Sequence, residues 1–295
     1  MDEKCTGCQD NQNGSCSASS CSSGNSCSTG NSCAGPEKLA ANDSTMVENI
    51  IAIMSGKGGV GKSSVTSLMA VSLAKQGYKV GILDADITGP SIPKMFGVMD
   101  RPGKGTGIGF EPPKSPILNI KIMSLNLLLE NEDDPVIWRG PILSGAVKQF
   151  WTDVEWGKLD YLLLDLPPGT GDVPLTVMQQ IPLNALVIVT SPQDLASMVV
   201  RKAVKMVSLM EPPIPILGMV ENMSYYVCPH CGKESQIFGQ GHGETAAKLG
   251  LPMLATLPID PKFSELCDKG RIEEYEIDAF KNIPELVKKL VNNAS

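Results

Sequence analysis

The sequence predicts an α/β fold, with a mostly parallel sheet covered by helices on both faces. Strand-like apolar runs alternate along the chain with segments whose apolar residues recur at helical spacing. Runs such as Leu162-Leu163-Leu164 and Leu186-Val187-Ile188-Val189 are apolar throughout, as expected of parallel strands buried between two helical layers. A glycine-rich segment, Gly56–Ser63, directly follows the first strand-like run. Together these observations indicate a phosphate-binding α/β domain.

Each expected element follows from its local pattern. The first strand is the β-branched run Asn49–Met54, and the first helix runs from Ser63 to Gln76, where Gly77 ends it. Later strands, recognised as short apolar runs, are expected at 78–84, 117–124, 161–165, 185–190, 214–220 and 253–257. Later helices, recognised by their apolar periodicity, are expected at 142–154, 194–210, 244–249 and 263–269.

The chain divides into two parts by composition. Residues 1–45 are rich in Ser, Gly, Asn and Cys and contain almost no large apolar side chains. Because such a segment cannot offset the entropy cost of ordering by burial, we expect a flexible, disordered, Cys-rich extension. Residues 46–295 contain the alternating strands and helices and are expected to form one nucleotide-binding domain.

Charge and hydropathy exclude several classes of protein. The net charge of -7 and the pI near 5.0 argue against a nucleic-acid partner, which would require a basic surface. No apolar run approaches the ~20 residues of a membrane-spanning helix, and the polar N-terminus does not resemble a signal peptide. We therefore expect a cytoplasmic protein without a membrane partner. Its nine cysteines should be reduced, and clustered cysteines in that compartment are more often metal ligands than disulfides.

The segment Gly56-Lys57-Gly58-Gly59-Val60-Gly61-Lys62-Ser63 fits the phosphate-loop pattern G-x-x-x-x-G-K-[ST] at every fixed position. The glycines let backbone N–H groups surround phosphate oxygens, and the following helix N-terminus adds a favourable dipole. Lys62 is expected to neutralise the β- and γ-phosphates, and the Ser63 hydroxyl to ligate Mg²⁺. Nucleotide contacts are expected along the whole segment and at Ser64.

Two expected strands end in aspartates. Asp84-Ala85-Asp86 follows one strand and Asp165 ends another, and ligands of open α/β sheets bind at such carboxyl ends. Asp165 is expected to hold Mg²⁺ through its water shell, Asp86 to orient or deprotonate the attacking water, and Asp84 to support them. The Pro-Pro-Gly-Thr-Gly after Asp165 suits a switch segment that senses the γ-phosphate. The alternative for Asp84 and Asp86 is turn or capping chemistry at a strand end.

The lysine near the start of the phosphate loop indicates which group of phosphate-loop proteins the chain resembles. The pattern Lys-Gly-Gly-x-Gly-Lys-[ST] resembles the deviant phosphate loop of the MinD, ParA and nitrogenase iron protein group. That resemblance implies that Lys57 reaches across a homodimer to the partner's nucleotide and acts in trans, like an arginine finger. A solvated loop lysine is the alternative.

The segment Cys228-Pro229-His230-Cys231-Gly232 is the second chemical signal, and three interpretations stay open. It resembles half of a zinc ribbon, but a structural zinc needs four ligands. It is also a possible dithiol redox motif, although no convincing helix follows it. In a homodimer, two such pairs could instead supply the four thiolates of a [4Fe–4S] cluster. Cys267, by contrast, is expected to be an ordinary buried thiol.

The chain resembles the Mrp/ApbC family of iron–sulfur cluster carrier ATPases, the nucleotide-binding scaffold proteins of eukaryotes. The matching segments occur in the family order and are Gly56–Ser63, Asp84–Ser91, Trp138–Pro141, Asp165–Asp172, Glu221–Ser224 and Cys228–Cys231. The resemblance implies that Asn222 hydrogen-bonds the adenine of ATP and that Cys228 and Cys231 bridge a labile [4Fe–4S] cluster between protomers. It also implies transfer of that cluster to apo-proteins, with ATP hydrolysis influencing the exchange. Thr88 stands where a tyrosine is common.

The N-terminal cysteines resemble part of the four-cysteine, ferredoxin-like extension of some relatives. The upstream cysteine of that extension is absent here, and the later cysteines follow at irregular spacing. Cys5, Cys8 and Cys16 are the expected ligands of a second [4Fe–4S] cluster, with the fourth ligand open. The alternative is a tail that binds metal adventitiously.

Two other functions compete with cluster transfer. One is a positioning or partitioning ATPase of the MinD or ParA kind, which would need a membrane helix or a basic DNA-binding face. The apolar stripe from Phe280 to Val291 is interrupted by Pro284 and by the lysines Lys288 and Lys289, so we expect an ordinary packing helix there. The other is a reductase like the nitrogenase iron protein, whose cluster cysteines lie on separate loops rather than side by side.

Overall fold

The computed structural model describes residues 38–86, 91–98, 102–104, 109–124, 127, 140–238 and 244–294. Several sites predicted from the sequence lie outside these residues. They are the tail cysteines Cys5, Cys8 and Cys16, the position Thr88, and Trp138 with Arg139.

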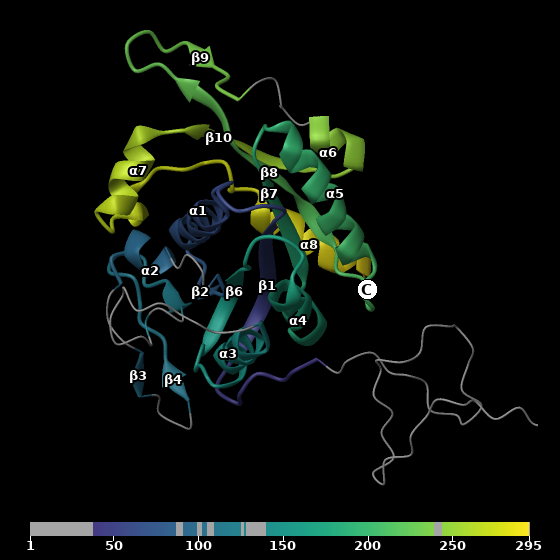
Figure 1. The fold of residues 1–295 in the computed structure, drawn as a ribbon. Helices are drawn as coiled ribbons and strands as arrows, with labels where there is room; N and C mark the ends of the chain where they lie inside the picture. The colour runs from purple at the N-terminus through teal and green to yellow at the C-terminus, as the bar shows by residue number, and fades with distance from the viewer. Residues whose placement is uncertain are drawn as a thin grey trace, which may run out of the picture. The chain divides into compact units, whose positions relative to one another are not determined.

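The central sheet has the strand order β10-β8-β7-β1-β6-β2-β5, and every neighbouring pair on this path is parallel (Figure 1). Its strands are β1 (Met46–Ser55), β2 (Val80–Asp84), β5 (Lys121–Ser124), β6 (Lys158–Asp165), β7 (Ala185–Thr190), β8 (Ile216–Val227) and β10 (Met253–Ile259). The short β9 (Glu234–Ser235) pairs antiparallel with the end of β8. A separate antiparallel pair is formed by β3 (Gly103–Lys104) and β4 (Phe110–Glu111). The predicted parallel α/β architecture is confirmed.

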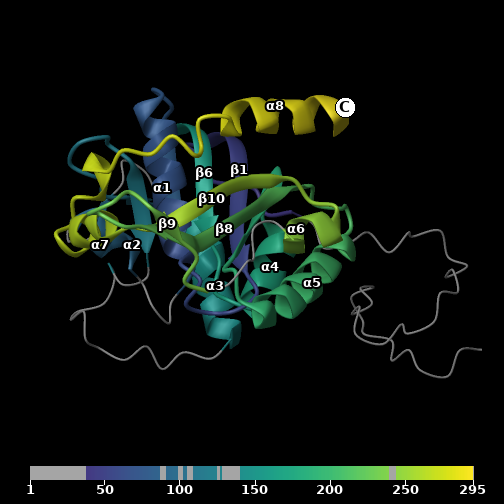
Figure 2. The ribbon, with the colours of Figure 1, turned by 90° about the horizontal axis from the view of Figure 1, so that it is seen from above.

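Helices cover both faces of the sheet (Figure 2). They are α1 (Lys62–Lys75), α2 (Ile92–Met95), α3 (Gly140–Thr152), α4 (Asp172–Gln180), α5 (Asp194–Ser208), α6 (Glu244–Leu249), α7 (Pro261–Asp268) and α8 (Ile283–Ala294), with a 3₁₀ turn at Ile272–Glu274. One buried cluster joins the sheet to α1, α2 and α8, and another joins its opposite face to α3, α4, α5 and α6. The strands between these clusters are apolar on both faces, which explains their continuous hydrophobic runs.

Helix α4 was not expected from the sequence. Its first turn contains Pro174, and the preceding Pro-Pro-Gly-Thr-Gly segment gives only loop signals. Proline is tolerated in the first turn because the N–H groups there have no partner within the helix. Val173, Val177 and Met178 are buried against the core, so tertiary packing holds this short helix in place.

Residues 38–45, which we expected within the flexible extension, lie against the folded domain. The backbone N–H of Leu39 donates to Gln180 O at 2.7 Å, and its carbonyl accepts from the Trp151 indole at 2.9 Å. The Asn42 amide donates to two carbonyls at the end of α3 and just beyond it. Leu39 and Asn42 are therefore hydrogen-bonded to α3, α4 and Val154, and this part of the predicted extension lies against the domain.

The C-terminal apolar stripe forms α8 and packs on the sheet, as expected. Phe280, Ile283 and Val287 are buried in the cluster that also contains α1. Within the described residues, no helix combines the length and the apolar character needed to cross a bilayer.

Candidate nucleotide and thiol sites

The phosphate loop connects β1 to α1 at the carboxyl edge of the sheet. Gly59 and Gly61 both have φ of 78°, a left-handed conformation that favours glycine. Gly61 is the N-cap residue of α1 and makes no side-chain capping bond, so the first amides of the helix are available to an anion. At Gly56, a Cβ would lie 2.9 Å from the backbone carbon of Val199, which excludes larger residues. The loop therefore has the backbone geometry that phosphate binding requires.

Asp165 is fully buried beneath this loop and gathers polar groups from α1. Ser63 Oγ donates to Asp165 Oδ2 at 2.6 Å, and Thr66 Oγ1 donates to Asp165 Oδ1 at 2.7 Å. The predicted magnesium pair of Ser63 and Asp165 is thus in direct contact. Thr66 was not predicted as a site residue. Its position one helical turn beyond Lys62 is the only sequence signal that could have indicated it.

Lys62 is buried and lies between two carboxylates. Its Nζ is 2.7 Å from Asp165 Oδ2 and 3.4 Å from Asp86 Oδ2. Despite these ion pairs, Nζ makes no hydrogen bond of acceptable geometry within the described residues. Such a buried ammonium can donate to phosphate oxygens without breaking a hydrogen bond already formed. Together with the Ser63–Asp165 pair, it fits a nucleotide phosphate with Mg²⁺.

Asp84 is buried next to Asp165, which is its register partner across β2 and β6. Burial, followed by the charge of Asp165, raises the pKa of Asp84 well above its usual value. Its carboxylate accepts a 3.1 Å bond from Ser124 Oγ and another 3.1 Å bond from the Asp86 backbone N–H. Asp84 therefore braces the turn that carries Asp86 toward Lys62.

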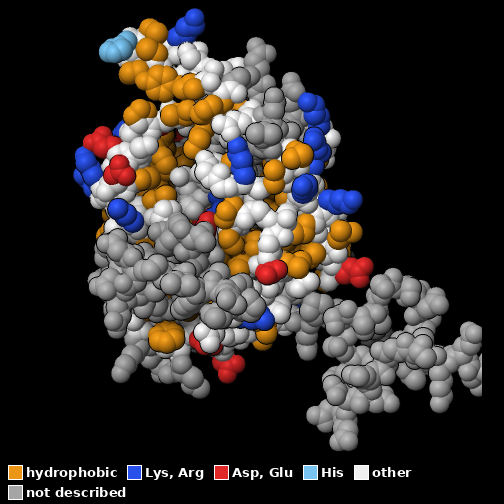
Figure 3. Space-filling model, viewed as in Figure 1, with side chains coloured by type: hydrophobic (Ala, Val, Ile, Leu, Met, Phe, Trp, Pro, Cys, Tyr) orange, Lys and Arg blue, Asp and Glu red, His pale blue; other side chains and the backbone are white. Residues whose placement is uncertain are grey.

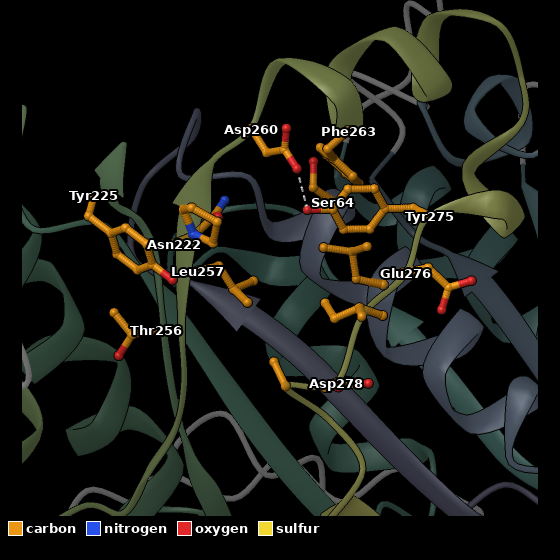
Figure 4. A pocket seen from close by; sticks show the side chains of 14 residues that line it. Ser64, Asn222, Tyr225, Thr256, Leu257, Asp260, Phe263, Tyr275, Glu276 and Asp278 are labelled. Atoms are coloured by element: carbon orange, nitrogen blue, oxygen red, sulfur yellow. Dashed lines mark hydrogen bonds between the residues drawn. The ribbon is translucent and has the colours of Figure 1, made fainter. Parts of the chain in front are cut away.

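Two cavities meet at Ser64. The first, about 320 Å³, is lined by the phosphate loop together with Asp86, Ser91, Met95 and Pro168. The second, about 180 Å³, is lined on one side by Asn222 and Tyr225 of β8 and on the other by the segment after β10 (Figure 4). Ser64 lines both, so the two cavities lie next to each other, as the phosphates and the base of one nucleotide would require.

The wall of the second cavity is built by an aromatic pair and a hydrogen bond. Tyr275 OH donates to Asp260 Oδ2 at 2.7 Å (Figure 4). The rings of Phe263 and Tyr275 pack edge to face, with centroids 5.3 Å apart. Mixed aromatic and polar walls of this kind suit a nucleotide base and ribose. None of these three residues was predicted, because they lie outside any recognisable motif.

The remaining nucleotide candidates, Asn222 and Lys57, have protein partners in this structure. Asn222 Nδ2 donates to the phosphate-loop carbonyl of Val60 at 3.0 Å, while the residue also lines the second cavity. Lys57 Nζ donates to the side chain of Gln193, just before α5. Asn222 is therefore placed beside the expected base site, and Lys57 contacts its own chain here.

Cys228 and Cys231 lie in the turn between β8 and β9. The turn is closed by hydrogen bonds from Cys228 N to Lys233 O at 3.0 Å and from Gly232 N to Cys228 O at 2.9 Å. Backbone N–H groups of Cys231 and His230 point at the Cys228 sulfur, and with the Cys231 thiol they lower the pKa of Cys228. A thiolate held in this way is prepared to bind metal. Both flanking elements are strands, so the helix of a dithiol redox motif is missing.

The described residues supply only these two thiols to the turn. They contain no group of three or more Cys, His, Asp or Glu side chains able to hold a metal ion. The hairpin also presents exposed apolar side chains near the cysteines, with Val227 42%, Ile237 54% and Phe238 39% exposed (Figure 3). A zinc or iron–sulfur site at this turn would therefore need ligands from another molecule or from residues outside those described.

Cys267 belongs to a different environment. It is half-buried in α7, and burial, with a smaller effect of Asp268, raises its pKa to about 11. Such a thiol is neutral at physiological pH, and Cys267 is not part of the thiol turn.

Comparison with known proteins identifies the family. A family model described as ParA, the NUBPL iron-transfer P-loop NTPase, matches residues 46–293. This chain belongs to that family. The resemblance to the Mrp/ApbC carriers is thereby confirmed, and the chain is a P-loop NTPase.

Relatives of this NUBPL-family chain extend over most of its length. The iron-sulfur cluster carrier protein of Clostridium perfringens is 48% identical over 248 residues, which cover 81% of this chain and 86% of that protein. A nucleotide-binding protein from Archaeoglobus fulgidus, solved in complex with ADP, is 47% identical with a TM-score of 0.71 and covers 80% of this chain and 91% of its own. The cell division ATPase MinD of Pyrococcus furiosus has a TM-score of 0.57 at 22% identity, covering 84% of this chain and 100% of its own. The MinD likeness concerns the fold alone.

Proposed function

We propose that this protein is an ATPase that carries a labile [4Fe–4S] cluster between two copies of itself and transfers it to apo-proteins. The observation that supports this most is the pair Cys228 and Cys231, held in a turn that directly follows a strand lining the second cavity. The carrier name of a 48% identical relative supports the same reading.

The nucleotide part of the proposal uses the residues gathered at the phosphate loop. The backbone of Gly56–Ser64 and the Lys62 ammonium hold the ATP phosphates, and Asn222 with the second cavity receives the adenine. Ser63 and Asp165 hold Mg²⁺, which neutralises charge on the phosphates when bound. Asp86 orients or deprotonates the attacking water from its position beside Lys62.

The cluster is cargo, and its ligand count argues for a homodimer. A [4Fe–4S] cluster takes four thiolates, while Cys228 and Cys231 supply two. A two-fold axis through the turn would double them, with the exposed apolar side chains of the hairpin packing around the cluster. The same pairing would let Lys57 leave Gln193 and reach the partner's nucleotide.

Further parts of the proposal concern the tail and the compartment. Cys5, Cys8 and Cys16 contribute to a second [4Fe–4S] cluster, following the resemblance of the tail to a ferredoxin-like extension. Labile clusters and free thiols need a reducing environment, so the protein acts in the cytoplasm. We propose no nucleic-acid or membrane partner. A positioning switch of the MinD kind would leave the cysteine turn without a role.

The test compares cysteine variants of the full chain after anaerobic reconstitution. We expect the Cys228→Ala, Cys231→Ala variant to lose about four iron atoms per dimer and its cluster-dependent dimerisation. The half-buried Cys267→Ala is the matched control and should retain both. Iron and sulfide analysis with light scattering measures the outcome. A doubly substituted protein with unchanged iron content and dimerisation would disprove the bridging site.

A further inference from the structure

Strand β8 is paired with β7 along only the first half of its length. It pairs with β7 up to the register pair Thr190↔Glu221. On its other side β8 pairs with β10 both before and after Glu221, and near its end it also pairs with β9. The second half of β8 therefore extends past β7 and continues into the cysteine hairpin, as the green strand in Figure 1 shows.

The end of the pairing with β7 lies close to a kink at Met223. This residue has φ of 60°, a left-handed conformation that is uncommon in residues other than glycine and costs about 1–2 kcal/mol. The kink is held by the buried Ser224 hydroxyl, which donates to the Glu221 carbonyl at 3.1 Å and to its carboxylate at 2.8 Å. The register of β10 shifts opposite this point, between Thr256 and Pro258. The kink is therefore built into both strands.

The kink also lies against the phosphate loop. A Cβ placed on Gly61 would be 2.1 Å from Asn222 Nδ2 and 3.6 Å from Met223 Cε. Asn222 is bonded to the Val60 carbonyl as well. Tyr225, two residues beyond the kink, lines the second cavity. The segment that leads to Cys228 thus lines the second cavity directly and contacts Gly61, which lines the first.

We propose that Asn222 and Met223 form a positioning joint through which nucleotide occupancy sets the conformation of the Cys228–Cys231 turn. The inference deepens the proposed function, since it takes this turn as the cargo site. Filling the two cavities immobilises the phosphate loop, Asn222 and Tyr225, and the stiff second half of β8 carries that restraint to the turn. The route along one strand is short, whereas Asp165 lies on β6, which β1 and β7 separate from β8.

The test is the rate of alkylation of each cysteine in the full chain, read from peptides by mass spectrometry. The protein is kept dilute and monomeric, as checked by light scattering, so that dimerisation cannot shield the thiols. Saturating MgADP should slow alkylation of Cys228 and Cys231 by about fivefold, which corresponds to a modest coupling between two sites. A wild-type protein whose rates ignore MgADP would overturn the proposal.

Two variants address the joint. Met223→Gly makes this position flexible, because glycine adopts left-handed and extended backbone about equally readily, and Ser224→Ala removes the hydroxyl that holds the kink; each should reduce the MgADP effect to less than about twofold. The matched control is Met46→Gly, at a strand position 66% exposed, which should keep the full effect. If either variant fails to fold, the other still tests whether the joint transmits the effect of MgADP. Retention of the wild-type ratio in a folded joint variant would contradict the inference.

The same variants separate this inference from the proposed function. Anaerobic reconstitution of Met223→Gly should still give a cluster-bound dimer, because both cysteines are present. If Met223→Gly binds the cluster and its alkylation rates respond to MgADP as in the wild type, only the proposed joint is contradicted, and the proposed function stands. Loss of the MgADP response in a variant that keeps its cluster supports the joint independently of transfer activity.

Discussion

Gly59 and Gly61 show how the surroundings of a residue determine its importance. Both have φ of 78° in the phosphate loop. A Cβ on Gly59 would meet nothing within 4 Å, whereas a Cβ on Gly61 would lie 2.1 Å from Asn222 Nδ2. The two positions share one backbone requirement, but only Gly61 also carries a packing requirement.

Alanine substitutions should separate these two requirements. Gly59→Ala should lower the free energy of unfolding by about 1–2 kcal/mol, the cost of a left-handed alanine. Gly61→Ala should cost about 1–3 kcal/mol more, because Asn222 must move and its bond to Val60 is lost. Urea denaturation measures both values, and ADP titration should show weaker binding for Gly61→Ala. Equal unfolding free energies for the two variants would contradict the role of Asn222.

At the scale of elements, the segment 38–45 acts as a strap across α3 and α4. Lys38 Nζ donates to the carbonyls of Met178 and Ile181 at 2.7 and 3.2 Å, at the C-terminal end of α4. A positive charge there stabilises the helix through its dipole. Since α4 closely follows Pro168, which lines the first cavity, the strap holds the far end of a helix that begins a few residues after that cavity wall.

Removing one strap contact should loosen these helices. Asn42 Nδ2 donates to Thr152 O at 3.0 Å and Val154 O at 2.8 Å. Asn42→Ala should therefore lower the unfolding free energy by about 1–3 kcal/mol, with faster amide exchange at the end of α3. Asp43→Ala changes the exposed neighbouring residue and should stay within about 0.5 kcal/mol of wild type. An Asn42→Ala protein as stable as this control would show that the strap contributes little.

At the scale of the whole molecule, the sheet order brings separate segments of the chain to one edge. Asp84 and Asp165 are register partners across β2 and β6, and β1 between β6 and β7 carries the phosphate loop. The thiol turn extends from the same edge through β8. Within one chain, Lys57 of the phosphate loop is hydrogen-bonded to Gln193. The described part of one chain also supplies only one pair of thiols to the thiol turn. Both features are accounted for if two molecules pair.

Mixing two inactive variants tests this pairing. Lys57→Ala keeps its own Asp86 but cannot assist a partner, whereas Asp86→Asn can still supply Lys57. Either variant alone should lose most ATPase activity. An equal mixture should recover about a quarter of the wild-type rate, because half the dimers are mixed and each has one complete site. Steady-state phosphate release measures the rate; a mixture no faster than its components would show that Lys57 does not act in trans.

The phosphate loop was predictable because its determinants are contiguous, a short pattern with a strand before it and a helix after it. Asp165 was predictable because it ends an apolar strand, and its carboxylate lies within hydrogen-bond distance of Ser63. Thr66, Asp260 and Tyr275 were missed because their roles depend on neighbours distant in the sequence. Helix α4 and the strap were missed because loop-forming or polar residues gain order there only through packing and long-range hydrogen bonds.

The sequence by itself determined the alternation of strands and helices, the phosphate loop and the pair of neighbouring thiols, since each depends on residues close together in the chain. Only the tertiary structure decided that the pairing of β8 with β7 ends at Glu221, that Met223 adopts a left-handed backbone, and that Asn222 bonds the phosphate loop. The physical reason is that strand partners and strained dihedral angles are set by contacts between distant segments, which no local pattern encodes.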